Sequence, residues 1–300
     1  MNETQAKLWQ VLQRSYRVPV APPTVPEEIS GDPILPPELE REIFELAAAI
    51  PNYWTEQHVG DMALILPQVC RRAQSWIEPL IYERISLPPF NDRGDRILLF
   101  LRTIDSRPAS FFAANVKYLY FDQTVQLPVI QRVLRVCTGV VSLGCYYPYS
   151  SLAPLLAPLP LERLLVSKLD LPSTPTHAPV WTASLTHLGL WRVLPPDPSV
   201  IFGALPALTH LAVDFNALRD STMGTALARL LAAGPHLRCL VLATTGRVGR
   251  RVASRRLHGD RFSDPRFYMG DSIGTGWFKV RGVEDLFADA EGYLKRQVKS

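Results

Sequence analysis

The sequence lacks a long hydrophobic run and a secretion signal. Its best candidate for a membrane span, residues 151–166, is interrupted by three prolines, and none of its apolar runs reaches the roughly 18 to 20 residues that a membrane-spanning helix needs. The first residues lack the basic segment followed by an apolar segment of a signal peptide. These absences predict a protein without a membrane span that resides in the cytoplasm or the nucleus.

Cysteine is scarce, and its spacing gives no support to several chemistries. The four cysteines, Cys70, Cys137, Cys145 and Cys239, lie far apart and form no Cys-x-x-Cys pair. A zinc site and a redox motif therefore have no support. We expect reduced thiols that are mostly buried, and neither a metal nor an organic cofactor.

The sequence also lacks the common catalytic and nucleotide-binding motifs. It contains no Gly-x-Ser-x-Gly, no His-Glu-x-x-His, no Gly-x-Gly-x-x-Gly and no phosphate-binding Gly-x-x-x-x-Gly-Lys-(Ser/Thr) segment. Its six histidines do not cluster in sequence with Asp or Glu. We therefore predict that the chain is not an enzyme.

An excess of one charge is confined to one segment. The net charge is +4, while residues 247–256 alone contain five arginines and no acidic residue. A nucleic-acid-binding protein spreads its basic excess over a face, so we do not expect nucleic acid as the main partner. We predict a surface loop over residues 246–263. Its role has two alternatives: it is a solvated loop without a partner, or it contacts an acidic protein, nucleic acid or an import receptor.

The overall composition predicts a folded protein. Of the 300 residues 47% are hydrophobic and 20% are charged, which suffices for a substantial core. Residues 1–34 are expected to form a short helix and then an extended linker, because four prolines fall between Pro19 and Pro26.

The stretch from residue 35 to residue 87 predicts three short amphipathic helices. The pair Pro36-Pro37 suits the start of a helix, where missing amide protons cost nothing. A second apolar series runs over residues 62–76 with a break expected at Pro67, and Pro79 is expected to begin the third helix. The first helix has an apolar face at spacings of three and four residues, formed by Leu39, Ile43, Leu46, Ala47 and Ile50.

The same stretch resembles an F-box. That motif has a Leu-Pro-x-Glu-Leu opening, an Ile-Phe pair, a Val-Cys-basic-basic centre and a Pro-Leu-Ile-Tyr end. All four are present, as residues 35–39, 43–44, 69–72 and 79–82. The resemblance implies a helical module that docks on a Skp-type linker protein, which joins it to a cullin scaffold. The docking residues that it implies are Leu35, Pro36, Leu39, Ile43, Phe44 and Val69.

Residues 97–245 repeat an apolar-x-x-apolar-x-apolar pattern six times. The copies start 24, 21, 24, 23 and 29 residues apart, at Val116, Val140, Leu161, Leu185, Leu208 and Leu237. A period of roughly 20 to 29 residues is typical of leucine-rich repeats. Segments that can form helices lie between the copies, for example at residues 129–136 and 221–233. Strand–helix units with short links predict a parallel sheet.

Side chains alternate between the two faces of each predicted strand. The two later apolar residues of each copy point into the core, so the residues between and after them form ladders on the concave side. Aromatic residues and arginine are enriched at protein-recognition surfaces. We predict that a protein substrate binds to these ladders, through Tyr118, Tyr120, Arg163, His187, Trp191, His210 and Asp214.

The dipeptide Thr-His occurs in two neighbouring repeats. Adjacent strands lie about 4.8 Å apart, so His187 and His210 are expected to be neighbours. A metal pair is conceivable, but no Cys or carboxylate falls where it would complete the site. We predict no metal there, and leave open a partner contact or no role for the two imidazoles.

Residues 264–300 are predicted to cap the repeats with a helix, because a solenoid needs a terminal cap. The turn Asp264-Pro265-Arg266-Phe267 and the helix beginning at Glu284-Asp285-Leu286-Phe287 also resemble the end of F-box-like leucine-rich proteins that are abundant in mushroom-forming fungi. Together with the F-box-like opening, this resemblance spans most of the chain.

The predicted fold is an α/β chain with three parts: a three-helix F-box-like module, an irregular leucine-rich-repeat-like solenoid of about six repeats, and a C-terminal capping helix. The resemblance implies a substrate-recruiting adaptor of an SCF-type (Skp, cullin, F-box) ubiquitin ligase. The alternative is a non-catalytic protein-binding scaffold with a degenerate F-box that does not engage the ubiquitin machinery. An exposed apolar patch at Pro36, Leu39 and Phe44 would favour the adaptor.

Overall fold

The computed structural model describes residues 35–49, 61–87, 95–171, 179–218, 222–244, 246–270 and 286–297. The chain divides into two compact units, residues 1–42 and 43–300. The predicted helix and linker in residues 1–34, and the apolar position at residue 50, lie outside the described residues. In the described part, no helix is long and apolar enough to cross a membrane.

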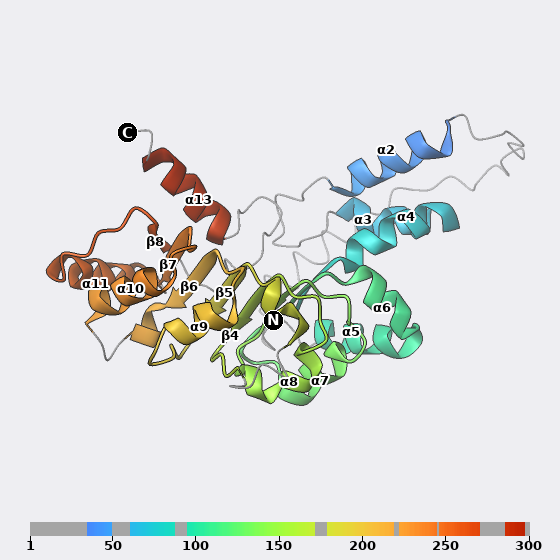
Figure 1. Ribbon diagram of the computed structural model, residues 1–300. Helices are drawn as coiled ribbons and strands as arrows, with labels where there is room; N and C mark the ends of the chain where they lie inside the picture. The colour runs from blue at the N-terminus through green and yellow to red at the C-terminus, as the bar shows by residue number, and fades with distance from the viewer. Residues whose placement is uncertain are drawn as a thin grey trace, which may run out of the picture. The chain divides into compact units, whose positions relative to one another are not determined.

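A parallel sheet is the central feature of the second unit (Figure 1). Its eight strands lie side by side in the order of the sequence, and each pairs in parallel with the next. The chain is therefore an α/β protein with a parallel sheet. The strands are β1 (Arg84–Leu87), β2 (Tyr118–Phe121), β3 (Ser142–Gly144), β4 (Arg163–Val166), β5 (His187–Leu190), β6 (His210–Asp214), β7 (Cys239–Ala243) and β8 (Phe267–Gly270).

All six predicted strands are present as β2 to β7, in the predicted register. Arg163 of β4 pairs with His187 of β5, which pairs with His210 of β6, and the next partner is Cys239 of β7. Two further strands were not predicted. β1 lies at the end of the F-box-like stretch, and β8 lies in the segment that we expected to be a cap.

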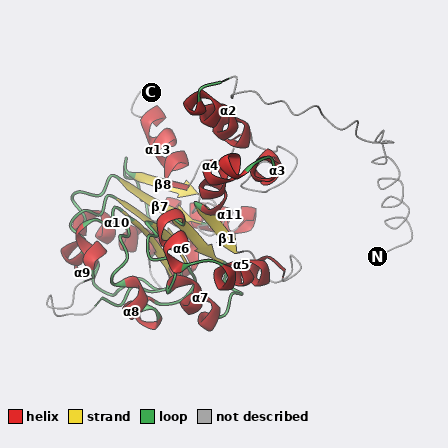
Figure 2. Ribbon diagram, turned by 90° about the vertical axis from the view of Figure 1, so that its right-hand side faces the viewer, coloured by secondary structure: helices red, strands yellow, loops and turns green. Residues whose placement is uncertain are grey.

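The helices between strands cover one face of the sheet. Apolar side chains from one face of the strands and from these helices form one large buried cluster. Figures 1 and 2 show α7, α8 and α9 along this side. The helices are α5 (Asp95–Ser106), α6 (Ala109–Asn115), α7 (Leu127–Leu134), α8 (Ala153–Leu156), α9 (Ser199–Ala204), α10 (Met223–Ala233) and α11 (Gly246–Gly259). The short 3-10 turns η2 (Tyr149–Ser151), η4 (Val180–Ala183) and η5 (Phe215–Leu218) complete the connections.

A second, smaller apolar cluster lies on the other face of the sheet, because successive side chains of a strand point to opposite faces. Leu164 and Val166 belong to the large cluster, whereas Leu165 between them belongs to a smaller one. The smaller cluster includes Leu286 and Phe287 of the last helix, α13 (Leu286–Gln297). Both faces are therefore packed where α13 lies.

The arginine-rich segment is a helix, and our prediction of a loop there is wrong. It forms α11 (Gly246–Gly259), whose Ala253 and Leu257 lie one turn apart and are buried in the large cluster. Arginine itself favours helices, and Arg256 stacks over the ring of Phe215 at 5.7 Å. Two well-placed apolar residues thus hold the segment as a helix on the sheet unit.

The described part of the F-box-like stretch is helical up to Tyr82, with two differences from the prediction: α4 continues through Pro79, and the stretch ends in the strand β1. It contains α2 (Pro37–Ala49), α3 (Asp61–Ile65), η1 (Leu66–Gln68) and α4 (Arg71–Tyr82). Pro67 lies in η1 as the expected break, and Cys70 begins α4 by accepting a hydrogen bond from the Ala73 amide at 3.4 Å. Pro79 lies inside α4 and begins no third helix, because the helix continues through the hydrogen bond from the Glu83 amide to the Pro79 carbonyl.

The cysteines are free, as expected. Cys137, Cys145 and Cys239 are buried and Cys70 is exposed. Burial raises the pKa of each buried thiol to about 12. These three thiols stay protonated at neutral pH and are poor nucleophiles.

Candidate functional site

The predicted docking residues are mostly exposed. Leu35, Pro36, Leu39, Ile43 and Val69 are open to solvent. Phe44 is half-buried, and its ring packs edge-on against Trp76 with centroids 6.1 Å apart. The apolar core of these helices instead consists of Ala48, Ala63, Leu66 and Ile77. The role of Phe44 is therefore partly structural.

Helix α2 presents a row of large apolar side chains to solvent. Leu39, Ile43 and Leu46 follow one another at helical spacing and are 49%, 52% and 63% exposed. Half of the sixteen exposed large hydrophobic side chains in the described part lie between residues 35 and 69. This concentration of exposed apolar side chains makes the segment a candidate interaction site. Sequence reasoning placed Leu46 on the apolar face of the helix but not among the docking residues.

The predicted substrate-binding residues share one face of the sheet but differ in exposure. Tyr118, Tyr120, Arg163, His187 and Trp191 are half-buried. His210 is 6% exposed and Asp214 is fully buried, so the expected accessibility is wrong for these two. Asp214 Oδ1 accepts hydrogen bonds from the amide and the side chain of Asn216, at 2.8 and 2.7 Å. That carboxylate holds the turn after β6 in place.

Helix α13 covers part of this face, which explains the burial. We predicted that the helix caps the last repeat. It does not cover the last strand alone but packs across the sheet face, where Leu286, Phe287 and Ala290 form a cluster with side chains of β4, β6 and β7. Gly270 of β8 permits the approach, because a Cβ atom there would lie 2.6 Å from a methyl group of Leu286. The predicted binding face is thus occupied at one end by the chain itself.

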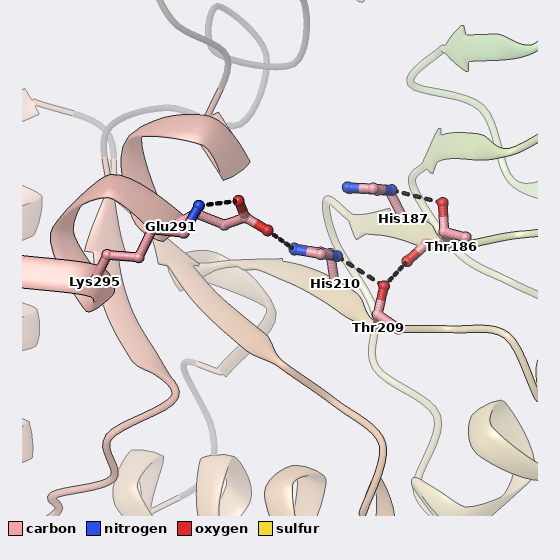
Figure 3. A network of polar contacts seen from close by, with 6 residues as sticks. All are labelled: Thr186, His187, Thr209, His210, Glu291 and Lys295. Atoms are coloured by element: carbon pink, nitrogen blue, oxygen red, sulfur yellow. Dashed lines mark hydrogen bonds and ion pairs between the residues drawn. The ribbon is translucent and has the colours of Figure 1, made fainter. Parts of the chain in front are cut away.

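Two stacked imidazoles lie beneath α13 (Figure 3). The rings of His187 and His210 are nearly parallel, with centroids 4.2 Å apart. The ring of Phe287 meets both edge-on, at 5.0 and 5.4 Å. Each imidazole Nδ1 contacts the hydroxyl group of the preceding threonine, Thr186 or Thr209, at 2.7 and 2.8 Å. The expectation that the two histidines are neighbours is confirmed.

An acidic residue of α13 binds the second imidazole. His210 Nε2 lies 3.0 Å from Glu291 Oε1, and Lys295 donates to the other oxygen of Glu291 at 3.3 Å. A carboxylate only accepts hydrogen bonds, so Nε2 carries the hydrogen and, in the neutral ring, Nδ1 accepts from Thr209. Sequence reasoning missed Glu291, which is 81 residues away from His210 in the chain and carries no local signal.

Burial and the hydrogen bond between His210 and Glu291 shift the pKa of each group in opposite directions. Burial lowers the pKa of His210 below its usual value, and the contact with Glu291 only partly offsets this. For Glu291, burial alone would raise the pKa, but the hydrogen bonds from His210 and Lys295 bring it below its usual value. His210 is therefore neutral and Glu291 charged at neutral pH.

The order hydroxyl, imidazole, carboxylate in Thr209, His210 and Glu291 has the form of a hydrolase triad. The same hydroxyl–imidazole contact recurs one strand away, at Thr186 and His187. The arrangement thus follows from the repeated Thr-His dipeptide, and its buried imidazole serves the packing of α13. Among the described residues no group of three or more metal-ligating side chains is found.

Aromatic side chains also gather on the same face of the sheet. The hydroxyl groups of Tyr120 and Tyr146 are 2.8 Å apart, and Tyr146 meets Trp191 edge-on at 4.8 Å. Burial raises the pKa of Tyr120, so its hydroxyl stays protonated. Arg84 of β1 stacks over Tyr118 at 4.1 Å. Sequence reasoning missed Arg84 because it missed β1.

Comparison with known proteins adds no assignment to this geometry. No family model matches the chain, and no curated protein and no solved structure is significantly similar to it. What can be said about function rests on two surfaces: the apolar row on α2 and the sheet face that carries the aromatic residues and the histidines.

Proposed function

We propose that the chain is a non-catalytic adaptor that recruits a protein substrate to an SCF-type ubiquitin ligase. In this proposal, α2 and the helices after it dock on a Skp-type linker protein, and a cullin scaffold binds the linker. The sheet face binds the substrate. The F-box-like residue string motivates the linker, and the exposure of the string's apolar positions supports it.

The observation that carries the proposal is the solvent-exposed row on α2. Leu39, Ile43 and Leu46 lie on one side of a helix, and a partner with an apolar groove recognises such a side through anchors at these spacings. Ala48, on the same helix, faces the small core of the module and is buried. The exposed row is therefore not needed to hold that core together.

The substrate would bind to the half-buried aromatic part of the sheet face. Tyr118, Tyr120 and Trp191 supply large, rigid contact areas, and Arg84 adds a charge that is already stacked on Tyr118. The mechanism is proximity. A substrate held beside the ubiquitin-conjugating enzyme on the same scaffold reacts at a raised effective concentration.

A co-purification experiment with matched variants tests the docking. The full chain would be expressed with the Skp-type linker protein of its own organism, as wild type, as Leu39→Asp/Ile43→Asp, and as Leu98→Asp/Leu99→Asp. The control leucines lie on α5 and are 54% and 56% exposed, so the same change is made at equally exposed positions. We expect the wild type and the control to retain the linker and the α2 variant to lose it. Loss in both variants, or in neither, would refute docking through α2.

A second candidate function is a stand-alone binding scaffold. One observation favours it: the F-box-like stretch ends in β1, the first strand of the sheet. Helix α4 is also tied to the turn between α5 and α6 by an ion pair between Glu78 and Arg107 at 2.5 Å, and Arg107 stacks over Phe111 of α6 at 4.5 Å. A module built into the sheet in this way could serve as its N-terminal cap. A folded wild type that binds no Skp-type protein would favour this function.

A further inference from the structure

The two faces of the sheet are held by two independent apolar clusters. The large cluster joins the strands to α5–α11 and contains no residue of α13. The smaller one consists of eight buried side chains, of which α13 provides Leu286, Phe287 and Ala290. Separation of α13 from the sheet would therefore open the smaller cluster and leave the larger one closed.

The contacts of α13 are those of a bound amphipathic helix. Phe287 inserts over the stacked rings of His187 and His210, and the guanidinium group of Arg163 stacks on the ring of Phe287 at 5.8 Å. One turn later, Glu291 accepts a hydrogen bond from His210. An aromatic residue and a carboxylate four positions apart thus meet a row of cationic and imidazole side chains on three neighbouring strands. Figure 3 shows the contact between Glu291 and His210.

We infer that the sheet face beneath α13 is a helix-binding site that the chain occupies in cis. The partner that fits it is an amphipathic helix with an aromatic residue followed, four positions later, by Asp or Glu, and this helix competes with α13. If the proposed function holds, the competing helix belongs to the substrate, and only this identification rests on the proposed function. The site itself is defined by the contacts of α13.

Several features suit α13 to exchange. It has twelve residues, and isolated helices of this length are marginal in water, so its order depends on the sheet. One polar contact between α13 and the sheet joins Glu291 to a neutral imidazole, that of His210. The side chains of Glu291 and Lys295 remain 43% and 74% exposed. The helix is docked through an apolar stripe, and its contact with His210 comes from a side chain that stays partly open to solvent.

A peptide-binding experiment tests the site on the full chain. The probe is a fluorescein-labelled peptide with the sequence of residues 286–297. The receptors are the wild type and the variant Phe287→Ser/Glu291→Lys, in which the changes fall only on α13 and leave the sheet face intact. A peptide that carries the same two changes is the control probe.

We expect the variant to bind the native peptide at least ten-fold more tightly than the wild type does, because its own helix no longer competes. The control peptide should bind neither receptor. Equal affinity of the two receptors for the native peptide, binding of both peptides alike, or no binding by a variant whose circular dichroism shows it folded would overturn the inference.

Native-state hydrogen exchange of the wild type gives a second test that needs no variant. If α13 leaves the sheet as a unit, its amides exchange at least ten-fold faster than those of β6 and β7 after correction for intrinsic rates. Exchange of α13 at the same slow rate as these strands would show that it opens only with global unfolding, and would refute the inference. Neither test involves a Skp-type protein, so their outcome is independent of the docking proposal.

Discussion

Replacement of Phe287 by alanine measures how firmly α13 is bound. The Phe287 side chain is 2% exposed and contacts two imidazole rings and the guanidinium group of Arg163. Burial of a phenylalanine side chain contributes about 1.5–3 kcal/mol, and its ring contacts add about 0.5–1.5 kcal/mol. We expect Phe287→Ala to lower the free energy of unfolding by about 3 kcal/mol, or to shift the docking equilibrium of α13 by roughly 150-fold.

The assay is urea unfolding followed by fluorescence and circular dichroism. Tyr293→Ala is the matched control, since it truncates an aromatic residue of the same helix that is 39% exposed. Its cost should stay below about 1 kcal/mol, as for most surface changes. An effect of Phe287→Ala below about 1 kcal/mol, or equal to that of the control, would refute the view that this ring anchors the helix.

Three further predictions follow from buried contacts. The first concerns pH. In the folded state the pKa of His210 is below its usual value of 6.5 and the pKa of Glu291 is below its usual value of 4.5, so both groups bind fewer protons there than in the unfolded chain. The free energy of unfolding should therefore fall as pH drops from about 7 towards 4. The measurement is the urea midpoint of unfolding as a function of pH, and His210→Gln should remove most of its dependence on pH near pH 6. A wild-type midpoint that does not change with pH in this range would contradict the prediction. Gly270→Ala places a methyl group 2.6 Å from Leu286, and we expect a loss of about 1–2 kcal/mol with faster hydrogen exchange in α13. Ile77→Ala empties a fully buried position and should cost about 2–5 kcal/mol, with a lower thermal midpoint; an unchanged midpoint would contradict the assigned core.

The sheet could be predicted from the sequence because its signal is local and repeated. A strand of this kind places two apolar residues two positions apart on the buried side, and the pattern returns every 21 to 29 residues. β1 and β8 also carry such pairs, Ile85 with Leu87 and Phe267 with Met269. They were missed because β1 falls inside a stretch already interpreted as helical and β8 follows the arginine-rich segment.

The arginine-rich helix shows how composition can mislead. Glycine and a high charge suggested a loop, yet among the described side chains of α11 Ala253 and Leu257 supply its buried side. A surface helix needs only such a narrow apolar stripe, provided that the large cluster is there to receive it.

The position of α13 could not be predicted, for a different reason. Its amphipathic pattern was visible, but the surface that it covers is defined by pairs such as His210 and Glu291, which lie far apart in sequence. The pairing of residues on neighbouring strands could be predicted from the repeated pattern. Their exposure to solvent could not, because it depends on the contact between α13 and the sheet. The same limit applies to the exposed row of α2. Periodicity predicts one apolar face of the helix, but it does not decide whether the protein's own core or a partner covers that face.

The proposed function depends on the docking of a Skp-type linker protein on the exposed row of α2. The most direct measurement is titration calorimetry of the purified full chain with that protein from the same organism. We expect a one-to-one complex that Leu39→Asp/Ile43→Asp abolishes and Leu98→Asp/Leu99→Asp preserves, each variant remaining folded by circular dichroism. Absence of heat and of a co-eluting complex for the folded wild type would contradict it, and the chain would then be a binding scaffold without a link to ubiquitin transfer.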